Sequence, residues 1–217
     1  SAIKLVKNQL PRTPLIGFSG APFTLACYLV EGGASRNFEK TKGLMYSNLK
    51  AWELLMTKLT KVVISYLEAQ IEAGVDAIQL FDSWAGVLSE QDYQRYVAPY
   101  SQKIFSSIKK VPTIHFTTGN PSLLPSIAAA GGDVISVDWR ISIGKAWKLI
   151  GDNRAIQGNL DPAVLFAPFK VVKVEVKKIL VQTAGRVGYI FNLGHGIYPG
   201  TPYQNVVKLV EFVHKFG

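Results

Sequence analysis

The sequence is poor in cysteine, and Cys27 is the one cysteine among its 217 residues. A single cysteine excludes a disulfide within this sequence and a cysteine-rich metal site. Charged residues are also sparse at 18%, while hydrophobic residues make up 48%, which excludes a chain too polar to fold. The lack of cysteine pairs favours a reducing compartment. We therefore expect the cytoplasm, with a plastid as the open alternative.

Long apolar runs are missing as well. None approaches the roughly 20 residues that a helix needs to cross a bilayer, so we expect no membrane partner. The first residues, SAIKLVKNQLPRTP, lack the apolar stretch and cleavage site of a secretory signal. They are typical of a helix entered part-way along its length. We therefore expect further sequence upstream of residue 1.

Motifs of cofactor chemistry are absent too. The segment GFSGAPFT lacks the glycine spacing of a dinucleotide fingerprint, and no phosphate-binding P-loop occurs. The HxxxH and HExxH zinc spacings and a nucleophile triad are also missing. We therefore expect neither an organic cofactor nor a metal.

Acidic residues are fewer than basic ones, which gives a net charge of +9. Solvated helix faces account for much of such an excess, and a positive field also speeds the encounter with a polycarboxylate substrate. Nucleic acid is disfavoured because the basic residues are scattered and no binding motif occurs. The basic residues that suggest solvated helix faces are Lys170, Lys173, Lys177 and Lys178.

Six short apolar segments recur along the chain, and each has glycine or a polar residue at or near its end. Near-continuous apolar runs of this length predict strands that are buried on both faces, as in a parallel sheet. They are PLIGFSG (14–20), AIQLFDS (77–83), PTIHFTT (112–118), VISVDW (134–139), RAIQGNL (154–160) and GYIFNLG (188–194).

Helical patterns separate these segments, and strand–helix alternation predicts βαβ units. Polar residues follow nearly every strand, and a barrel gathers such strand ends around one mouth. We therefore predict an α/β fold of the (β/α)8 TIM barrel type, with about six of the eight strands present and the N-terminal ones lacking. No shift in composition marks a linker, so 1–217 is predicted to be a single domain. The predicted helices are 41–73, 90–109, 121–130, 142–150, 168–183 and 202–216.

The polar residues at the strand ends are the candidates for chemistry. For each one alone a structural role competes. Asp161 before Pro162 suits a helix N-cap, Asp138 suits pairing with Arg140 or with a neighbouring loop, and His115 suits a buried core histidine. The full set is Ser19, Asp82, Ser83, His115, Asp138, Arg140, Gln157, Asn159, Asp161, Asn192 and His195.

Two residues stand out from this set by their surroundings. His195 is flanked by Gly194 and Gly196, which allow a ligand to approach the backbone closely, and histidine binds carboxylates or moves protons near neutral pH. Tyr28 lies in ACYLVEGGASR after the first strand, in a predicted loop, where it is either a pocket donor or a packing residue.

Several segments together resemble uroporphyrinogen decarboxylase, and the resemblance covers essentially the whole chain. The matching segments are PLIGFSGAPFTLACYLVEGG, QLFDSWAG, DWR, IQGNLDP and NLGHGIYPGTP, in this order. The resemblance implies a homodimeric (β/α)8 barrel that converts uroporphyrinogen to coproporphyrinogen in haem and chlorophyll synthesis. It implies a lyase acting by four decarboxylations, without metal or organic cofactor.

By their places in these segments, Tyr28, Ser83 and His195 resemble the family's substrate-contacting Tyr, Ser and His, and Phe81 its neighbouring aromatic residue. The resemblance thus implies catalytic roles for Tyr28, Ser83 and His195. The family's arginine-rich RQAGR-type segment and its pyrrole-binding aspartate belong near the N-terminus and do not occur in this sequence.

Two other functions stay open at this point. One is a non-catalytic barrel fragment that binds tetrapyrrole or only dimerises. The other is a zinc-dependent methyltransferase of a related branch, whose zinc site resembles His-x-Cys where this chain has His115-Phe116-Thr117. A threonine is no thiolate ligand, so zinc is not expected.

Overall fold

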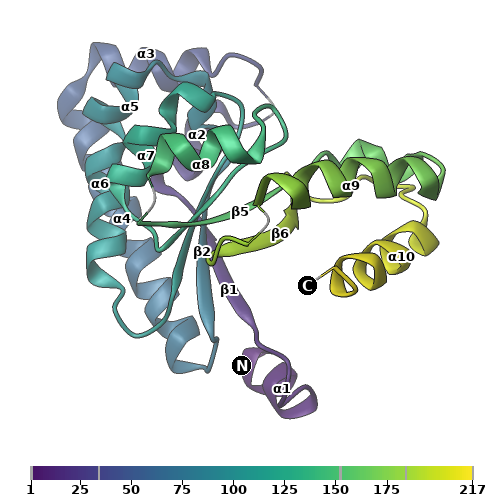
Figure 1. Ribbon diagram of the computed structural model, residues 1–217. Coiled ribbons are helices and arrows are strands. Elements are labelled where there is room, and N and C mark those ends of the chain that lie inside the picture. The colour runs from purple at the N-terminus through teal and green to yellow at the C-terminus, as the bar shows by residue number, and fades with distance from the viewer. Residues whose placement is uncertain (1, 34, 152, 184, 217) are drawn as a thin grey trace. The chain divides into compact units, whose positions relative to one another are not determined.

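A computed structural model describes residues 2–33, 35–151, 153–183 and 185–216. Strands and helices alternate along the chain (Figure 1). The strands are β1 (Ile16–Gly20), β2 (Ala77–Asp82), β3 (Thr113–Thr117), β4 (Val134–Ser136), β5 (Ala155–Leu160) and β6 (Tyr189–Leu193). The α-helices are α1 (Ala2–Gln9), α2 (Pro22–Glu31), α3 (Glu39–Ser47), α4 (Leu49–Glu72), α5 (Glu90–Tyr96), α6 (Ala98–Ser107), α7 (Leu124–Ala130), α8 (Ile143–Ile150), α9 (Phe169–Thr183) and α10 (Tyr203–His214). The 3-10 helices are η1 (Ala85–Val87), η2 (Pro121–Leu123) and η3 (Pro162–Phe166).

All six predicted strands form, and they follow one another in the sheet in chain order. The pairs β1–β2, β2–β3 and β5–β6 are parallel. The predicted α/β class with a parallel sheet is therefore confirmed. The chain divides into two compact units, Ser1–Ile135 and Ser136–Gly217, which are described one at a time. That they make up a single domain stays a prediction.

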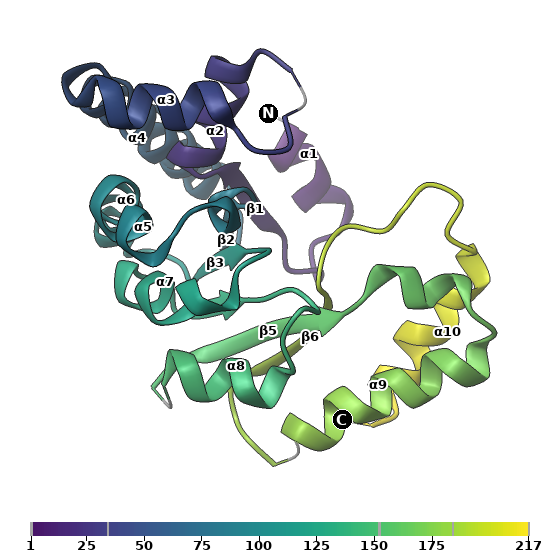
Figure 2. The same ribbon diagram turned by 90° about the horizontal axis from the view of Figure 1, so that it is seen from above.

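In the first unit, long helices cover the sheet because their apolar positions recur every three or four residues. Helix α4 buries Trp52, Met56, Val63 and Leu67 along one stripe. Val63 and Leu67 pack in a cluster with Ile78 and Leu80 of β2 and with residues of α6. Helices α4, α6 and α7 lie side by side along one face of β1–β3 (Figure 2).

The second unit repeats this arrangement on a smaller scale. Helices α8 and α9 pack against β5, and α10 packs beside α9 (Figures 1 and 2). Helix α9 buries Val172, Val176 and Ile179, which are three or four residues apart. Its lysines point outward, so the predicted solvated helix face is confirmed.

Three helix predictions are corrected. The stretch 41–73 is two helices, because Asn48 ends α3 and caps α4 by accepting a hydrogen bond from Ala51 N at 3.1 Å. The stretch 90–109 is also two helices, since Pro99 in the first turn of α6 cannot continue α5. Residues 26–31, the first part of the segment ACYLVEGGASR that was interpreted as a loop, lie in helix α2.

Candidate active site

The side chains with predicted site roles are divided between the two units. Tyr28, Phe81 and Ser83 belong to the first unit, and His195 belongs to the second. Ser83 directly follows β2, and His195 follows β6, so both occupy the carboxyl ends of parallel strands. Such ends are where barrel enzymes carry their active-site residues.

An apolar surface of three aromatic rings lies on neighbouring strands of the first unit. Phe81 of β2 packs edge-on against Phe18 of β1, with ring centroids 5.7 Å apart, and against Phe116 of β3 at 5.2 Å. Phe18 is 61% exposed. The parallel register aligns Phe81 with Phe116, which puts both rings on the same face of the sheet. On this face Phe18 and the partly exposed Phe81 leave apolar ring surface accessible near Ser83, whereas Phe116 is buried behind them.

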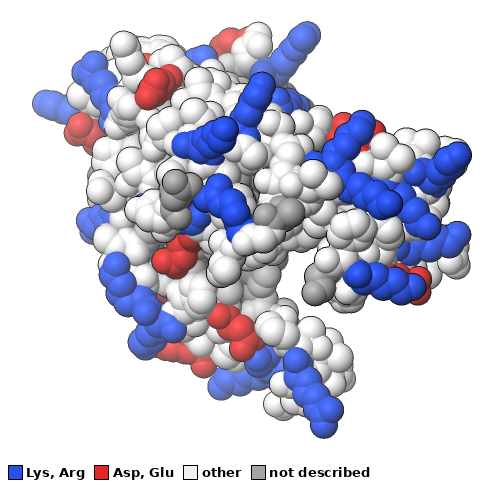
Figure 3. All heavy atoms as spheres, viewed as in Figure 1, with Lys and Arg blue, Asp and Glu red and all other residues white. Residues whose placement is uncertain are grey.

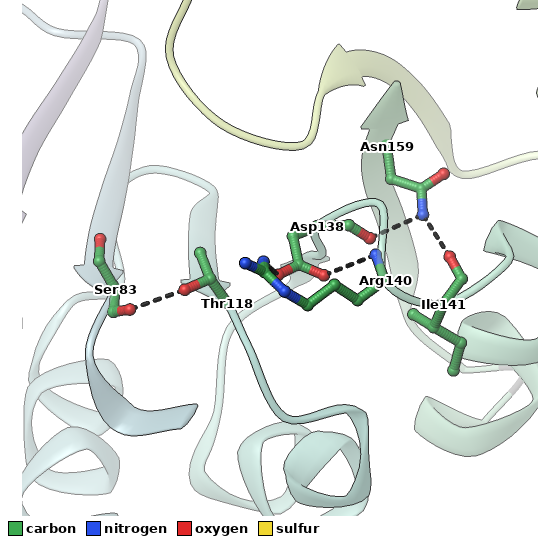
Figure 4. A network of polar contacts seen from close by, with 6 residues as sticks. All are labelled: Ser83, Thr118, Asp138, Arg140, Ile141 and Asn159. Atoms are coloured by element: carbon green, nitrogen blue, oxygen red, sulfur yellow. Dashed lines mark hydrogen bonds and ion pairs between the residues drawn. The ribbon is translucent and has the colours of Figure 1, made fainter. Parts of the chain in front are cut away.

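The backbone of Ser83 is fixed by the loop that follows β3. The hydroxyl of Thr118 donates to the carbonyl oxygen of Ser83 at 2.7 Å (Figure 4). Gly86, in the turn η1, passes so close to this loop that no side chain fits between them. Among the described residues the Ser83 hydroxyl makes no hydrogen bond, so it is available to a ligand.

Tyr28 lies on helix α2 and not in a loop, which corrects the prediction. Its ring packs on Trp84 with centroids 4.2 Å apart, and Trp84 packs on Phe38 at 4.9 Å. Tyr28 remains 59% exposed. The contact with Trp84, the residue after Ser83, brings the Tyr28 ring to the end of β2. Two of the predicted site residues therefore lie in one region of the first unit.

Asp82 lies between Phe81 and Ser83 but points the opposite way, into the core, where it is fully buried. Its Oδ1 atom accepts a hydrogen bond from the Thr24 hydroxyl at 3.0 Å. Its Oδ2 atom has no hydrogen-bond partner among the described residues. Burial outweighs the Thr24 hydrogen bond and raises the pKa of Asp82 to about 7.

This buried carboxyl predicts a stability that falls as the pH rises. Because the pKa is about 7 in the folded chain and about 4 when unfolded, the folded state binds more protons between these values. Raising the pH from 5 to 8 is therefore expected to lower the free energy of unfolding by roughly 2 kcal/mol, and Asp82→Asn is expected to remove most of that loss. Urea unfolding at both pH values measures the change. Equal pH dependence in the two proteins contradicts the assignment.

In the second unit, the predicted pairing of Asp138 with Arg140 is confirmed. Asp138 is buried, and it accepts hydrogen bonds from both the backbone and the guanidinium of Arg140 (Figure 4). The Asn159 side-chain amide donates to the carbonyl oxygens of Asp138 at 2.8 Å and of Ile141 at 2.6 Å. The segments DWR and QGNLDP are thus bound to each other, which accounts for Asp138 and Asn159 structurally.

His195 is exposed in the loop after β6. The glycine before it has a packing role: a Cβ atom on Gly194 would lie 2.8 Å from the backbone nitrogen of Trp139. A Cβ atom on Gly196 would meet nothing within 4 Å. We expected glycine at position 194 to let a ligand approach the backbone. In the structure, Gly194 instead makes room for the backbone of Trp139.

The remaining strand-end residues have structural partners. His115 is fully buried, with Nδ1 3.2 Å from the carbonyl oxygen of Gly131 and its ring against Phe105, so the core interpretation is confirmed. Asp161 caps η3 by accepting from Ala163 N at 2.9 Å, as predicted. Ser19, Gln157 and Asn192 bond to neighbouring backbone or side-chain groups.

Lys and Arg side chains are spread over the visible surface, and several lie on α9 and α10 (Figure 3). Within the described ranges, no cluster of three or more His, Cys, Asp or Glu side chains is arranged to hold a metal ion. Among the same residues, no helix has the length and apolar character of a membrane span.

Four residues of this region had not been predicted: Phe18, Phe116, Trp84 and Thr24. Phe18 and Phe116 lie inside the predicted strands, and the strand period of two could have assigned them to the face of Phe81. Thr24 lies 58 residues before Asp82, and only the packing of α2 on β2 brings the two together.

The chain matches the family model described as uroporphyrinogen decarboxylase (URO-D) over residues 1–216. The uroporphyrinogen decarboxylase of Carboxydothermus hydrogenoformans is 51% identical over 219 residues, covering 100% of this chain and 63% of that protein. The uroporphyrinogen decarboxylase of Geobacter metallireducens is 49% identical over 218 residues, covering 99% of this chain and 64% of that protein. The chain thus spans less than two thirds of the length of these relatives.

Solved structures with the same fold include a methyltransferase from Methanosarcina mazei, with a TM-score of 0.86 and 26% identity, covering 99% of this chain and 63% of that one. A B12-independent methionine synthase from Shewanella sp. W3-18-1 aligns with a TM-score of 0.68 and 15% identity, covering 99% and 66%, which shows the fold alone.

The parallel strands, the alternating helices and these neighbours place the chain in the class of TIM-barrel-like α/β proteins. Within that class, the chain belongs to the uroporphyrinogen decarboxylase family, as its sequence segments had predicted.

Proposed function

We propose that the protein carrying this chain is a uroporphyrinogen decarboxylase that removes the four acetate carboxyl groups of uroporphyrinogen and yields coproporphyrinogen. The observation that carries the proposal is the family membership across residues 1–216, with about half of all positions identical to proteins of that name. We further propose that the protein acts as a homodimer in the cytoplasm.

The aromatic surface of the first unit suits a substrate that has apolar pyrrole rings and charged carboxylates around them. Phe18 and Phe81 offer ring surface against which the pyrrole rings can pack, and the buried Phe116 supports Phe81 from the next strand. Ser83 follows Phe81 by two residues, and the Tyr28 ring packs on Trp84. Hydroxyl donors such as theirs suit the carboxylates around the rim of such a molecule. The net charge of +9 favours the approach of a polycarboxylate.

The chemistry that we propose uses the substrate as its own electron sink. Protonation of a pyrrole ring carbon gives a cationic ring, which accepts the electron pair left when an acetate arm loses CO2. A proton then adds to the former acetate carbon to give a methyl group, and the ring carbon releases the proton that it had gained, which restores the neutral pyrrole. Each arm thus consumes one proton and releases one CO2. The protein's part is to position the ring and its carboxylates, for which Tyr28, Ser83 and His195 are proposed.

The direct test is anaerobic incubation of the protein, at its full natural length, with uroporphyrinogen, followed by chromatography of the oxidised porphyrins. Stepwise appearance of products with seven to four carboxyl groups supports the proposal. A substrate that stays unchanged contradicts it, and favours either a tetrapyrrole-binding fragment or a methyltransferase. A methyl-transfer assay and a metal analysis separate these two.

Substitutions in the proposed site are expected to separate the chemical and binding roles. Tyr28→Phe and Ser83→Ala each remove one hydroxyl donor without opening a large cavity, so turnover is expected to fall about tenfold or more. His195→Asn is expected to raise KM or to change which intermediates accumulate, with a smaller effect on turnover. Steady-state rates and intermediate ratios measure all three. Wild-type values in every variant contradict the assignment.

A further inference from the structure

Helix α2 and the end of β2 are joined by a hydrogen bond that the proposed chemistry does not use. The Thr24 hydroxyl donates to Asp82 Oδ1 at 3.0 Å, and both residues are buried, with exposed fractions of 5% and 0%. A hydrogen bond to a buried carboxyl is costly to lose, because its partner then stays unsatisfied in the core. The bond therefore fixes α2 against β2 at one point along the helix.

The same hydroxyl reaches the residue that follows Ser83. The backbone nitrogen of Trp84 lies 3.4 Å from Thr24 Oγ1 and donates to it. Thr24 thus contacts the segment Asp82–Trp84 at both ends, on either side of Ser83. Thr24 of α2 therefore holds this turn from one side, as the Thr118 hydroxyl holds the carbonyl oxygen of Ser83.

Tyr28 is four residues after Thr24 on α2, so the two side chains lie on the same side of the helix one turn apart. The centroid of the Trp84 ring lies 4.2 Å from that of Tyr28 and 4.9 Å from that of Phe38. Phe38 is 4% exposed, so it is packed on nearly all sides. Trp84 is therefore attached to α2 twice, through its backbone at Thr24 and through its ring at Tyr28.

We propose that Thr24 and Asp82 are positioning residues: their buried hydrogen bond holds Trp84 against Tyr28, and so fixes the Tyr28 hydroxyl relative to Ser83. Neither residue is placed in contact with substrate. The effect of Thr24 and Asp82 on turnover rests on the proposed function, whereas their effect on the packing of the Tyr28 and Trp84 rings does not.

Thr24→Val tests the role because valine keeps the shape of threonine and lacks the hydroxyl. The kcat/KM for uroporphyrinogen is expected to fall about tenfold, since small displacements of a site residue have large effects on rate. Thr24→Ser keeps the donor and is expected to stay within about twofold of wild type. Thr60→Val is the matched control, because Thr60 is equally buried but donates only to Met56 O of its own helix.

A double-mutant cycle shows whether the effect passes through Tyr28. In a Tyr28→Phe background, Thr24→Val is expected to cost less than about threefold, because the hydroxyl that it positions is already gone. Full additivity of the two changes, or wild-type kcat/KM in Thr24→Val alone, overturns the proposal. If Thr24→Val does not fold, Thr24→Val combined with Asp82→Leu carries the test, since neither partner is then left unpaired.

A spectroscopic measurement tests the proposed positioning role independently of catalytic activity. The packed rings of Tyr28, Trp84 and Phe38 contribute to near-ultraviolet circular dichroism, and Thr24→Val is expected to change that signal while Thr24→Ser and Thr60→Val leave it as in wild type. An unchanged spectrum in Thr24→Val overturns the proposal. If wild type does not decarboxylate uroporphyrinogen, the proposed function fails, and the spectra still decide whether Thr24 and Asp82 hold the rings together.

Discussion

Replacing Gly86 with alanine is expected to lower the free energy of unfolding by roughly 3 kcal/mol and the thermal midpoint by about 6 °C or more. A Cβ atom at this position would lie 2.1 Å from the carbonyl oxygen of Thr118 and 2.9 Å from the backbone nitrogen of Asn120. Both are backbone atoms in a short turn, so no side-chain rotation can relieve the overlap. Either η1 or the loop after β3 must move.

The same substitution is expected to abolish most of the proposed activity, by about 100-fold in kcat/KM. Thr118 holds the carbonyl oxygen of Ser83 through its hydroxyl at 2.7 Å, so a displaced Thr118 releases the backbone of the predicted site serine. Differential scanning calorimetry and steady-state kinetics on the purified variant measure the two effects.

Gly43→Ala is the matched control for this experiment. Gly43 lies within α3, and a Cβ atom there would meet nothing within 4 Å. Alanine favours a helix interior over glycine by about 1 kcal/mol, so this variant is expected to be as stable as wild type or slightly more so. Equal thermal midpoints for Gly86→Ala and Gly43→Ala would show that the close contact at Gly86 has no energetic weight.

The strands could be predicted from the sequence because each contains a short apolar run. The predicted burial on both faces holds for β3, but it is wrong for β1 and β6, in which exposed residues alternate with more buried ones. In β2 and β3, residues such as Ile78, Leu80, Ile114 and Phe116 do not alternate with solvent-exposed residues, so the apolar run is nearly continuous. All six predicted ranges enclose the observed strands. Helix α2 was missed for the opposite reason. Its residues PFTLACYLVE are as apolar as a strand, and Ala21 at its start supplies no capping side chain.

The sequence indicates single residues of the site but not the contacts between residues that are distant in the chain. The segment QLFDSWAG places Phe81 and Ser83 at a strand end, which local sequence is enough to indicate. The neighbours of Trp84 are different, because Tyr28 and Phe38 are about fifty residues away in the chain and meet it only through tertiary packing. No periodicity encodes such a contact. The same holds for Thr24 and Asp82.

A second large loss of stability is expected from a substitution at Gly194, next to His195. Gly194→Ala is expected to reduce stability by about 2 kcal/mol, since its Cβ atom would lie 2.8 Å from Trp139 N, 2.9 Å from the Trp139 ring and 3.0 Å from Asp138 Cα. The Gly194 backbone nitrogen also donates to Leu160 O at 2.7 Å, so the segment cannot withdraw without losing that hydrogen bond. His195, the next residue, must therefore shift, and KM for uroporphyrinogen is expected to rise about tenfold.

Gly196→Ala tests whether the glycines beside His195 are required by the packing of the chain or by the binding of a ligand. A Cβ atom on Gly196 would meet no atom within 4 Å, and its φ lies outside the left-handed region, so the folded chain tolerates alanine there. If glycine serves the chain's own packing, thermal unfolding and turnover of Gly196→Ala match wild type while Gly194→Ala loses both. If Gly196→Ala keeps its thermal midpoint but loses affinity for uroporphyrinogen, the open side of Gly196 is where substrate approaches, and the requirement for glycine beside His195 is set by the ligand.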